Sequence, residues 1–194
     1  MRKVLFSICC ILALGACSPA PTSTPTRVPT AIPPTAAPTE TLAPVFTLSS
    51  PAFANGEPIP AVYTCKGNNT SPQLIWNEPP AGTKTFAIIV DDPDGAGYTH
   101  WVIYDIPAAS RGLPENVTKD QQALSDGVFQ GFNGSTIFGY EGMCPPSNTH
   151  HYSFRLYALD IVLEKKQGVG KKLLEQAMTG HILAQTELMG TFQP

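Results

Sequence analysis

The chain has 194 residues, of which 42% are hydrophobic, and its formal net charge is −3 at pH 7. Its basic residues never form more than short pairs such as Lys165-Lys166 and Lys171-Lys172. This pattern argues against a nucleic-acid partner, which would need a basic patch or stripe.

Residues 1–16 have the layout of a lipoprotein signal peptide. Arg2 and Lys3 precede an apolar run at 4–13, which is too short to span a bilayer permanently. The sequence Leu14-Gly15-Ala16-Cys17 follows, and it resembles a bacterial lipobox. The resemblance implies cleavage before Cys17 and lipidation of that cysteine. We therefore expect an extracytoplasmic lipoprotein of the bacterial cell envelope, held at the membrane only by its lipid. The alternative is an ordinary signal peptide with an incidental cysteine.

Residues 17–44 form the next predicted segment, which begins with the lipidated cysteine. From residue 18 on it contains eight prolines and seven threonines, and Arg27 and Glu40 are its only charged residues. Such a composition offers too little apolar surface to offset the entropy of ordering, so we expect an extended tether. At about 3.1 Å per residue, the tether could hold a domain roughly 80 Å from a membrane. The alternative is a proline-rich ligand for a recognition domain.

Residues 45–194 have a globular composition and a length that fits one domain. The β-branched, apolar run at 85–91 predicts a central strand that is covered on both faces. Residues 99–106 predict a second strand, which alternates between two faces. One face would carry His100, Val102, Tyr104 and Ile106, and the other Trp101 and Ile103. The turn residues at 92–98 predict a hairpin, which would place Asp92 close to His100.

The second half of this domain adds further strands and one helix. Residues 112–140 are weakly patterned and predict mostly loop. Residues 151–159 predict a strand with Tyr152 on its apolar face, and His150 shares the parity of Tyr152. A helix is expected at 170–179 and a last strand at 182–192. The predicted fold is mainly β, an antiparallel β-sandwich with peripheral helices near the C-terminus.

The cysteines predict a disulfide. Cys9 and Cys10 would leave with the signal peptide and Cys17 would be lipidated, which leaves Cys65 and Cys144. Two thiols in an oxidising compartment favour a bond between them. The alternative is two free, buried thiols.

Five short motifs then follow one another in a fixed order. They are Asn69-Thr70-Ser71-Pro72-Gln73-Leu74-Ile75-Trp76, Val90-Asp91-Asp92-Pro93-Asp94, Thr99-His100-Trp101-Val102, Gly142-Met143-Cys144-Pro145-Pro146 and His150-His151-Tyr152. Together they resemble the phosphatidylethanolamine-binding protein family, in particular its bacterial branch similar to Raf kinase inhibitor protein. The stretch Gly180-His181-Ile182-Leu183-Ala184 also resembles that branch, and the likeness extends over residues 46–192.

The resemblance implies a β-sandwich with a small pocket for phosphate-like head groups, and neither catalysis nor a cofactor. By motif position, the ligand contacts would be Asp92, Asp94, His100, His150 and Tyr152, with Cys144, Pro145 and Pro146 as one wall. This chain departs from the family at two positions. His151 stands where arginine is usual, and Met143 stands where proline is usual.

The residue types themselves suit an anion. Imidazole nitrogens, a tyrosine hydroxyl and backbone N–H groups are the donors that a phosphate group needs. We expect Asp92 to accept a hydrogen bond from His100 and so fix its tautomer. Asp94 would shape the loop or bind an ammonium group. Because neighbouring strand residues point to opposite faces, His151 should lie outside the pocket.

Two other function classes stay open. The aspartates and histidines include the residue types of a metal-dependent hydrolase, but His150 and His151 would point apart, so at most one could join His100. The other alternative is a protein-interaction module that inhibits or regulates a kinase or protease. Taken singly, the Asp92-Pro93-Asp94 sequence is typical of a turn, and Trp101 is typical of a core residue.

Overall fold

The computed structural model describes residues 45–163 and 169–194, which belong to one compact unit. The predicted signal peptide, Cys17 and the tether lie outside the described residues. Among the residues that are described, no helix is long and apolar enough to cross a membrane.

A five-stranded antiparallel sheet forms one layer, in the order β6-β4-β3-β7-β8. Its strands are β3 (Thr85–Asp92), β4 (Tyr98–Pro107), β6 (Phe129–Gln130), β7 (His150–Leu159) and β8 (Ile182–Phe192). The central strand β3 is buried at all of its positions. Its apolar run is therefore covered on both faces, as the sequence indicated.

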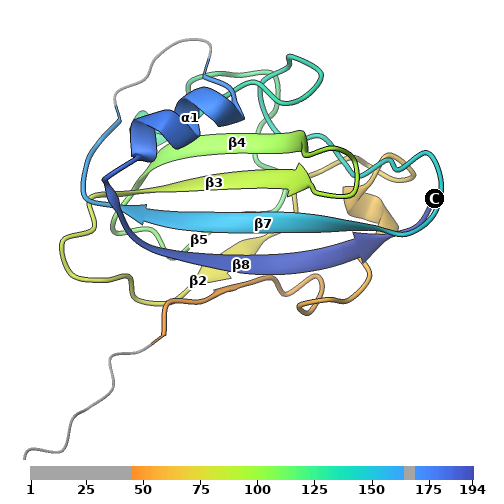
Figure 1. Cartoon of the computed structure of the whole chain (residues 1–194), viewed down its shortest axis with the longest axis horizontal. Helices are drawn as coiled ribbons and strands as arrows, with labels where there is room; N and C mark the ends of the chain where they lie inside the picture. Colours follow the sequence, from red (N-terminus) through yellow and green to blue (C-terminus); the bar gives the residue numbers. More distant parts are fainter. Residues whose placement is uncertain (1–44, 164–168) are drawn as a thin grey trace, which may run out of the picture. The chain divides into compact units, whose positions relative to one another are not determined.

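The second layer is a small antiparallel sheet in the order β1-β2-β5. It consists of β1 (Leu48–Ser49), β2 (Leu74–Trp76) and β5 (Gly112–Leu113), and it lies behind the large sheet in Figure 1. Leu74 and Trp76 from this sheet share one buried apolar cluster with Phe86, Ile88 and Phe154 from the large sheet. The predicted fold, an antiparallel β-sandwich, is confirmed.

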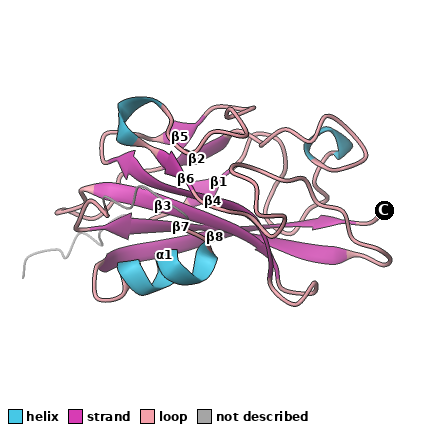
Figure 2. Ribbon diagram, turned by 90° about the horizontal axis from the view of Figure 1, so that it is seen from above, coloured by secondary structure: helices cyan, strands magenta, loops and turns pink. Residues whose placement is uncertain are grey.

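The outer face of the large sheet is covered by α1 (Lys171–Met178), opposite the small sheet (Figure 2). Leu174 and Met178 are buried against Ala87 and Ile89 of β3. Gly180 then adopts a positive φ of 82°, which suits a glycine at a helix end. This α-helix is the only one among the described residues, because η1 (Ala61–Tyr63) and η2 (Ser125–Gly127) are single 3₁₀ turns.

Two β-bulges in β4 correct the alternation predicted from the sequence. Val90 pairs with Trp101 while the next residue, Asp91, pairs with Thr99, so His100 is an extra residue. A second irregularity lies between Ile103 and Ile106. Because a bulge shifts the side-chain parity, the prediction that grouped His100 and Ile106 with Val102 and Tyr104 was wrong. Trp101, Ile103 and Ile106 instead share the cluster between the two sheets, whereas Val102 and Tyr104 face α1.

Candidate functional site

A cavity of about 260 Å³ opens at one end of the large sheet. Its lining comes from the end of β3, the start of β4, the start of β7 and the loop before β7. The lining residues are Asp92, Gly95, Tyr98, His100, Glu141, Gly142, Cys144, Pro145, Pro146 and His150.

The antiparallel sheet explains why these residues meet. The end of β3 lies beside the beginnings of both β4 and β7, since Asp92 pairs with Tyr98 and Asp91 pairs with Ser153. The bulge at His100 places this side chain toward the cavity together with Tyr98, while Thr99 lies on the opposite face near Lys171. Bulges commonly re-aim a side chain next to a site in this way.

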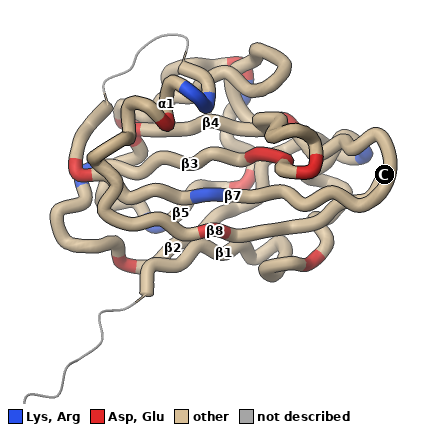
Figure 3. Tube along the Cα trace, viewed as in Figure 1, with Lys and Arg blue, Asp and Glu red and all other residues tan. Residues whose placement is uncertain are grey.

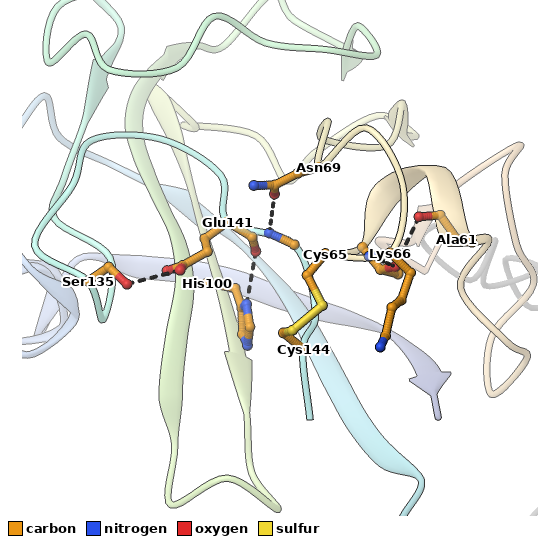
Figure 4. The surroundings of a disulfide bond; sticks show 10 residues. Ala61, Cys65, Lys66, Asn69, His100, Ser135, Glu141 and Cys144 are labelled. Atoms are coloured by element: carbon orange, nitrogen blue, oxygen red, sulfur yellow. Dashed lines mark hydrogen bonds between the residues drawn. A yellow bond between two sulfur atoms is a disulfide. The ribbon is translucent and has the colours of Figure 1, made fainter. Parts of the chain in front are cut away.

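His100 is fixed by the backbone of the loop before β7. Its Nδ1 lies 2.9 Å from the carbonyl oxygen of Glu141. The next residue, Gly142, donates its N–H to Oδ1 of Asn69 at 2.5 Å, which holds the loop in place (Figure 4). His100 is only 4% exposed, and this burial lowers its pKa below the ordinary value, although Glu141 and Asp92 oppose the effect.

Asp92 orients His150 rather than His100. Nδ1 of His150 lies 2.7 Å from Oδ2 of Asp92, and Oδ1 of Asp92 accepts the N–H of Gly95 at 2.7 Å. A Cβ atom at Gly95 would lie only 2.7 Å from that carboxylate, so the loop requires glycine there. The expected hydrogen bond from His100 to Asp92 was therefore wrong, because the bulge and the Glu141 carbonyl hold His100 elsewhere.

Tyr152 lies beneath the cavity rather than in its lining. Its ring is fully buried and meets His100 edge-on, with the ring centroids 5.3 Å apart. Its buried hydroxyl has no hydrogen-bond partner, although Asp92 is nearby. Burial first, and the Asp92 carboxylate second, raise the pKa of Tyr152 far above its ordinary value. The hydroxyl therefore keeps its proton at physiological pH and is a donor that lies close to the Asp92 carboxylate.

Asp94 and His151 lie outside the cavity lining, where they pair with each other. The backbone N–H of His151 donates to Oδ2 of Asp94 at 2.8 Å, and the ring Nδ1 lies 2.8 Å from the same oxygen. These bonds lower the pKa of Asp94, the backbone bond most of all. The place of His151 agrees with the strand parity, but the position of Asp94 does not support its assignment as a ligand contact.

One wall of the cavity is tied down by a disulfide. Cys144 is bonded to Cys65, which lies 79 residues earlier in the chain (Figure 4). Beside it, the N–H of Cys65 donates to the carbonyl of Met143. Pro145 and Pro146 follow directly and need little further ordering. Met143, which stands where the family usually has proline, is fully buried in the core between the sheets. Its side chain is therefore in an apolar environment.

The sequence reasoning missed four lining residues, which are Gly95, Tyr98, Glu141 and Gly142. Tyr98 was assigned to the turn at 92–98, whereas β4 already begins at this residue, two positions before His100. Glu141 orients His100 with its backbone carbonyl, which every residue possesses, so its side chain gave no sign of this role.

Metal coordination has no ready site in this part of the chain. Within residues 45–163 and 169–194, no group of three or more His, Cys, Asp or Glu side chains could hold a metal ion.

A larger cavity of about 570 Å³ lies at the other end of β4, between Ile106 and Val128. Among its described lining residues there is no histidine or cysteine, and Asp126 is the only charged one. The smaller cavity is therefore the better candidate, because it alone of the two contains grouped imidazoles and carboxylates.

Comparison with known proteins gives a family match over nearly the whole described region. The family model described as phosphatidylethanolamine-binding protein matches residues 49–193. A UPF0098 protein of Methanothermobacter thermautotrophicus is 47% identical over 148 residues, which cover 75% of this chain and 97% of that protein. The crystal structure of YbcL from Escherichia coli, described as a new member of the mammalian PEBP family, has a TM-score of 0.71 and 32% identity. It covers 77% of this chain and 98% of YbcL.

A second kind of relative also includes the N-terminal region. The candidate lipoprotein LppC of Mycobacterium tuberculosis is 36% identical over 190 residues, which cover 94% of this chain and 91% of LppC. Residues 45–194 alone could not supply so long a match. The likeness to LppC therefore includes part of the predicted signal peptide and tether.

Proposed function

Because the chain belongs to the phosphatidylethanolamine-binding protein family, we propose that its domain binds a small anionic or phosphorylated ligand without turning it over. The site is the cavity at the ends of β3, β4 and β7. The ligand would resemble phosphate or a phospholipid head group.

The observation that carries this proposal is the pair of oriented imidazoles in one small cavity. Both His100 and His150 use Nδ1 for a bond within the protein, to Glu141 and Asp92 respectively. Nε2 of each ring is thus left for a ligand, as a donor whenever the ring is protonated. The buried hydroxyl of Tyr152 lies close to Asp92 and keeps its proton, so it is a further donor beneath the cavity.

The proposal places this domain outside the cytoplasm, on a lipid-anchored tether. The lipobox-like sequence ending at Cys17 and the likeness to LppC support that location. In this arrangement the membrane contact is made by the lipid alone, and the cavity is free to take up its ligand from the surrounding compartment.

Calorimetric titration with inorganic phosphate tests the proposal. The wild-type protein is compared with a His100→Ala, His150→Ala double variant, which should bind phosphate at least about tenfold more weakly, since hydrogen bonds to a charged ligand are lost. The matched control is a His151→Ala, His181→Ala double variant. It also loses two imidazoles, but both are half-exposed and outside the cavity lining. Equal affinity in the wild type and the first variant would refute the assignment of the pocket.

A further inference from the structure

The cavity contains more hydrogen-bond acceptors than a phosphate site would be expected to have. Nδ1 of His100 faces a carbonyl oxygen, which can only accept, so this nitrogen carries the proton. In the neutral ring, Nε2 therefore has a lone pair and no hydrogen. The same reasoning applies to His150, because Nδ1 faces a carboxylate oxygen of Asp92.

The charges around the cavity also disfavour a fully ionised anion. Acidic residues lie at the end of β3 (Figure 3). The described lining of the cavity contains the carboxylates of Asp92 and Glu141, and it contains no lysine or arginine. The burial that keeps water from His100 disfavours its protonated form in the empty site. The titratable groups that face or surround His100 are Tyr98 on β4, Asp91 and Asp92 on β3, His150 and Tyr152 on β7, and Glu141 in the loop that precedes β7.

We propose that the cavity selects phosphate groups that carry a titratable proton, namely inorganic phosphate and phosphate monoesters, over phosphate diesters and sulfate. This inference rests on the proposed function and narrows its ligand class. It assigns His100 as the residue that determines the selectivity.

The chemistry is a single shared proton. A P–O–H group of the ligand donates to the lone pair on Nε2 of His100, or transfers its proton there, which leaves P–O⁻ beside an N–H donor. The second ionisation of a phosphate monoester has a pKa of about 6, so this proton is accessible near neutral pH. A phosphate diester and sulfate have no such proton near neutral pH. In the cavity their oxygens would face the Nε2 lone pairs and the carboxylates of the lining, which do not donate hydrogen bonds to them. Binding of a monoester dianion at higher pH must therefore take up one proton from solution.

Titration calorimetry with four small probes tests the selectivity. The mature chain from Cys17 is kept in a detergent without phosphate groups and titrated at about pH 6, where about half of the methyl phosphate carries the proton, with inorganic phosphate, methyl phosphate, dimethyl phosphate and sulfate. We expect the first two to bind at least about tenfold more tightly than the last two, the effect of one lost hydrogen bond to a charged group. Repeating the methyl phosphate titration at about pH 7.5, where nearly all of this ligand is the dianion, in buffers with different ionisation enthalpies should show close to one proton taken up per methyl phosphate bound.

A His100→Gln variant separates the selectivity from binding itself. Its side-chain amide supplies a permanent N–H donor, so we expect it to bind methyl phosphate and dimethyl phosphate about equally and without proton uptake. Proton uptake that persists in this variant would place the proton elsewhere and overturn the role of His100.

The remaining outcomes distinguish this inference from the proposed function. Tight binding of dimethyl phosphate by the wild type, with no proton uptake, would contradict the selectivity while leaving an anion pocket in place. Failure of all four probes to bind would overturn the anion pocket and the selectivity together.

Discussion

His100 combines a bulged position in its strand with a buried titratable ring. The bulge between Val90 and Asp91 of the partner strand admits it as an extra residue and directs it into the cavity. Burial lowers its pKa in the folded protein, whereas the unfolded chain restores the ordinary value of about 6.5. The unfolded state thus binds more protons than the folded state between these two pKa values.

This difference predicts how stability depends on pH. The free energy of unfolding should increase as the pH rises through the range just below 6.5. At lower pH the protein should be less stable, because protons bind more readily to His100 in the unfolded chain than to the buried ring in the folded protein. A His100→Gln variant lacks this contribution. Urea denaturation at pH 5 and pH 7 should therefore show a larger loss of stability on acidification in the wild type than in the variant. Parallel losses would mean that His100 titrates alike in the folded and unfolded states.

Strand parity assigned some side chains to the correct strand face and others to the wrong one, for identifiable reasons. It separated His150 from His151, because the start of β7 pairs regularly with β8. It failed for His100 because a bulge adds an extra residue to one strand opposite a single residue of its partner. The sequence of the bulged strand alone does not show where this happens. The hydrogen bond from His100 to the Glu141 carbonyl was not predictable either, since a backbone acceptor leaves no side-chain signature.

At the scale of elements, the cavity depends on a wall that is covalently held at one end. The segment from Cys144 leads into β7, and the disulfide to Cys65 fixes its start. Both cysteines are exposed, and the disulfide borders the cavity directly through Cys144. Its loss should affect both the stability of the fold and the shape of the site.

Replacing the disulfide by a Cys65→Ser, Cys144→Ser pair should destabilise the protein by about 4.5 kcal/mol, the chain-entropy value for closing a loop of this length. Phosphate affinity should fall as well, because the wall then has to be ordered when the ligand binds. Urea denaturation and phosphate titration of the variant measure the two effects. Phosphate affinity equal to that of the wild type would show that the wall keeps its position without the disulfide.

The long elements were predictable from the sequence, whereas the second sheet was not. The continuous apolar run of β3 and the apolar stripe of α1 are strong local patterns. The strands β1, β2 and β5 have only two or three residues each, too few to show a period. They are defined by their pairing partners, such as Leu74 with Leu113, and not by local sequence.

At the scale of the whole molecule, Cys17 is expected to decide where the binding domain resides. In a Cys17→Ser variant the lipobox lacks its acceptor for lipid, so the protein should move from the membrane fraction to the soluble extracytoplasmic fraction. Phosphate affinity should not change, because the cavity is built entirely from residues of the β-sandwich. Membrane association that survives the substitution would show that another part of the chain provides the anchor.

The central claim is that the cavity at the ends of β3, β4 and β7 is the anion site. A crystal structure with inorganic phosphate at about pH 6 tests it most directly, because it shows where the anion lies. We expect phosphate oxygens within hydrogen-bonding distance of Nε2 of His100 and Nε2 of His150. An empty cavity with phosphate bound elsewhere, such as beside Lys171 and Lys172 at the start of α1, would contradict the claim.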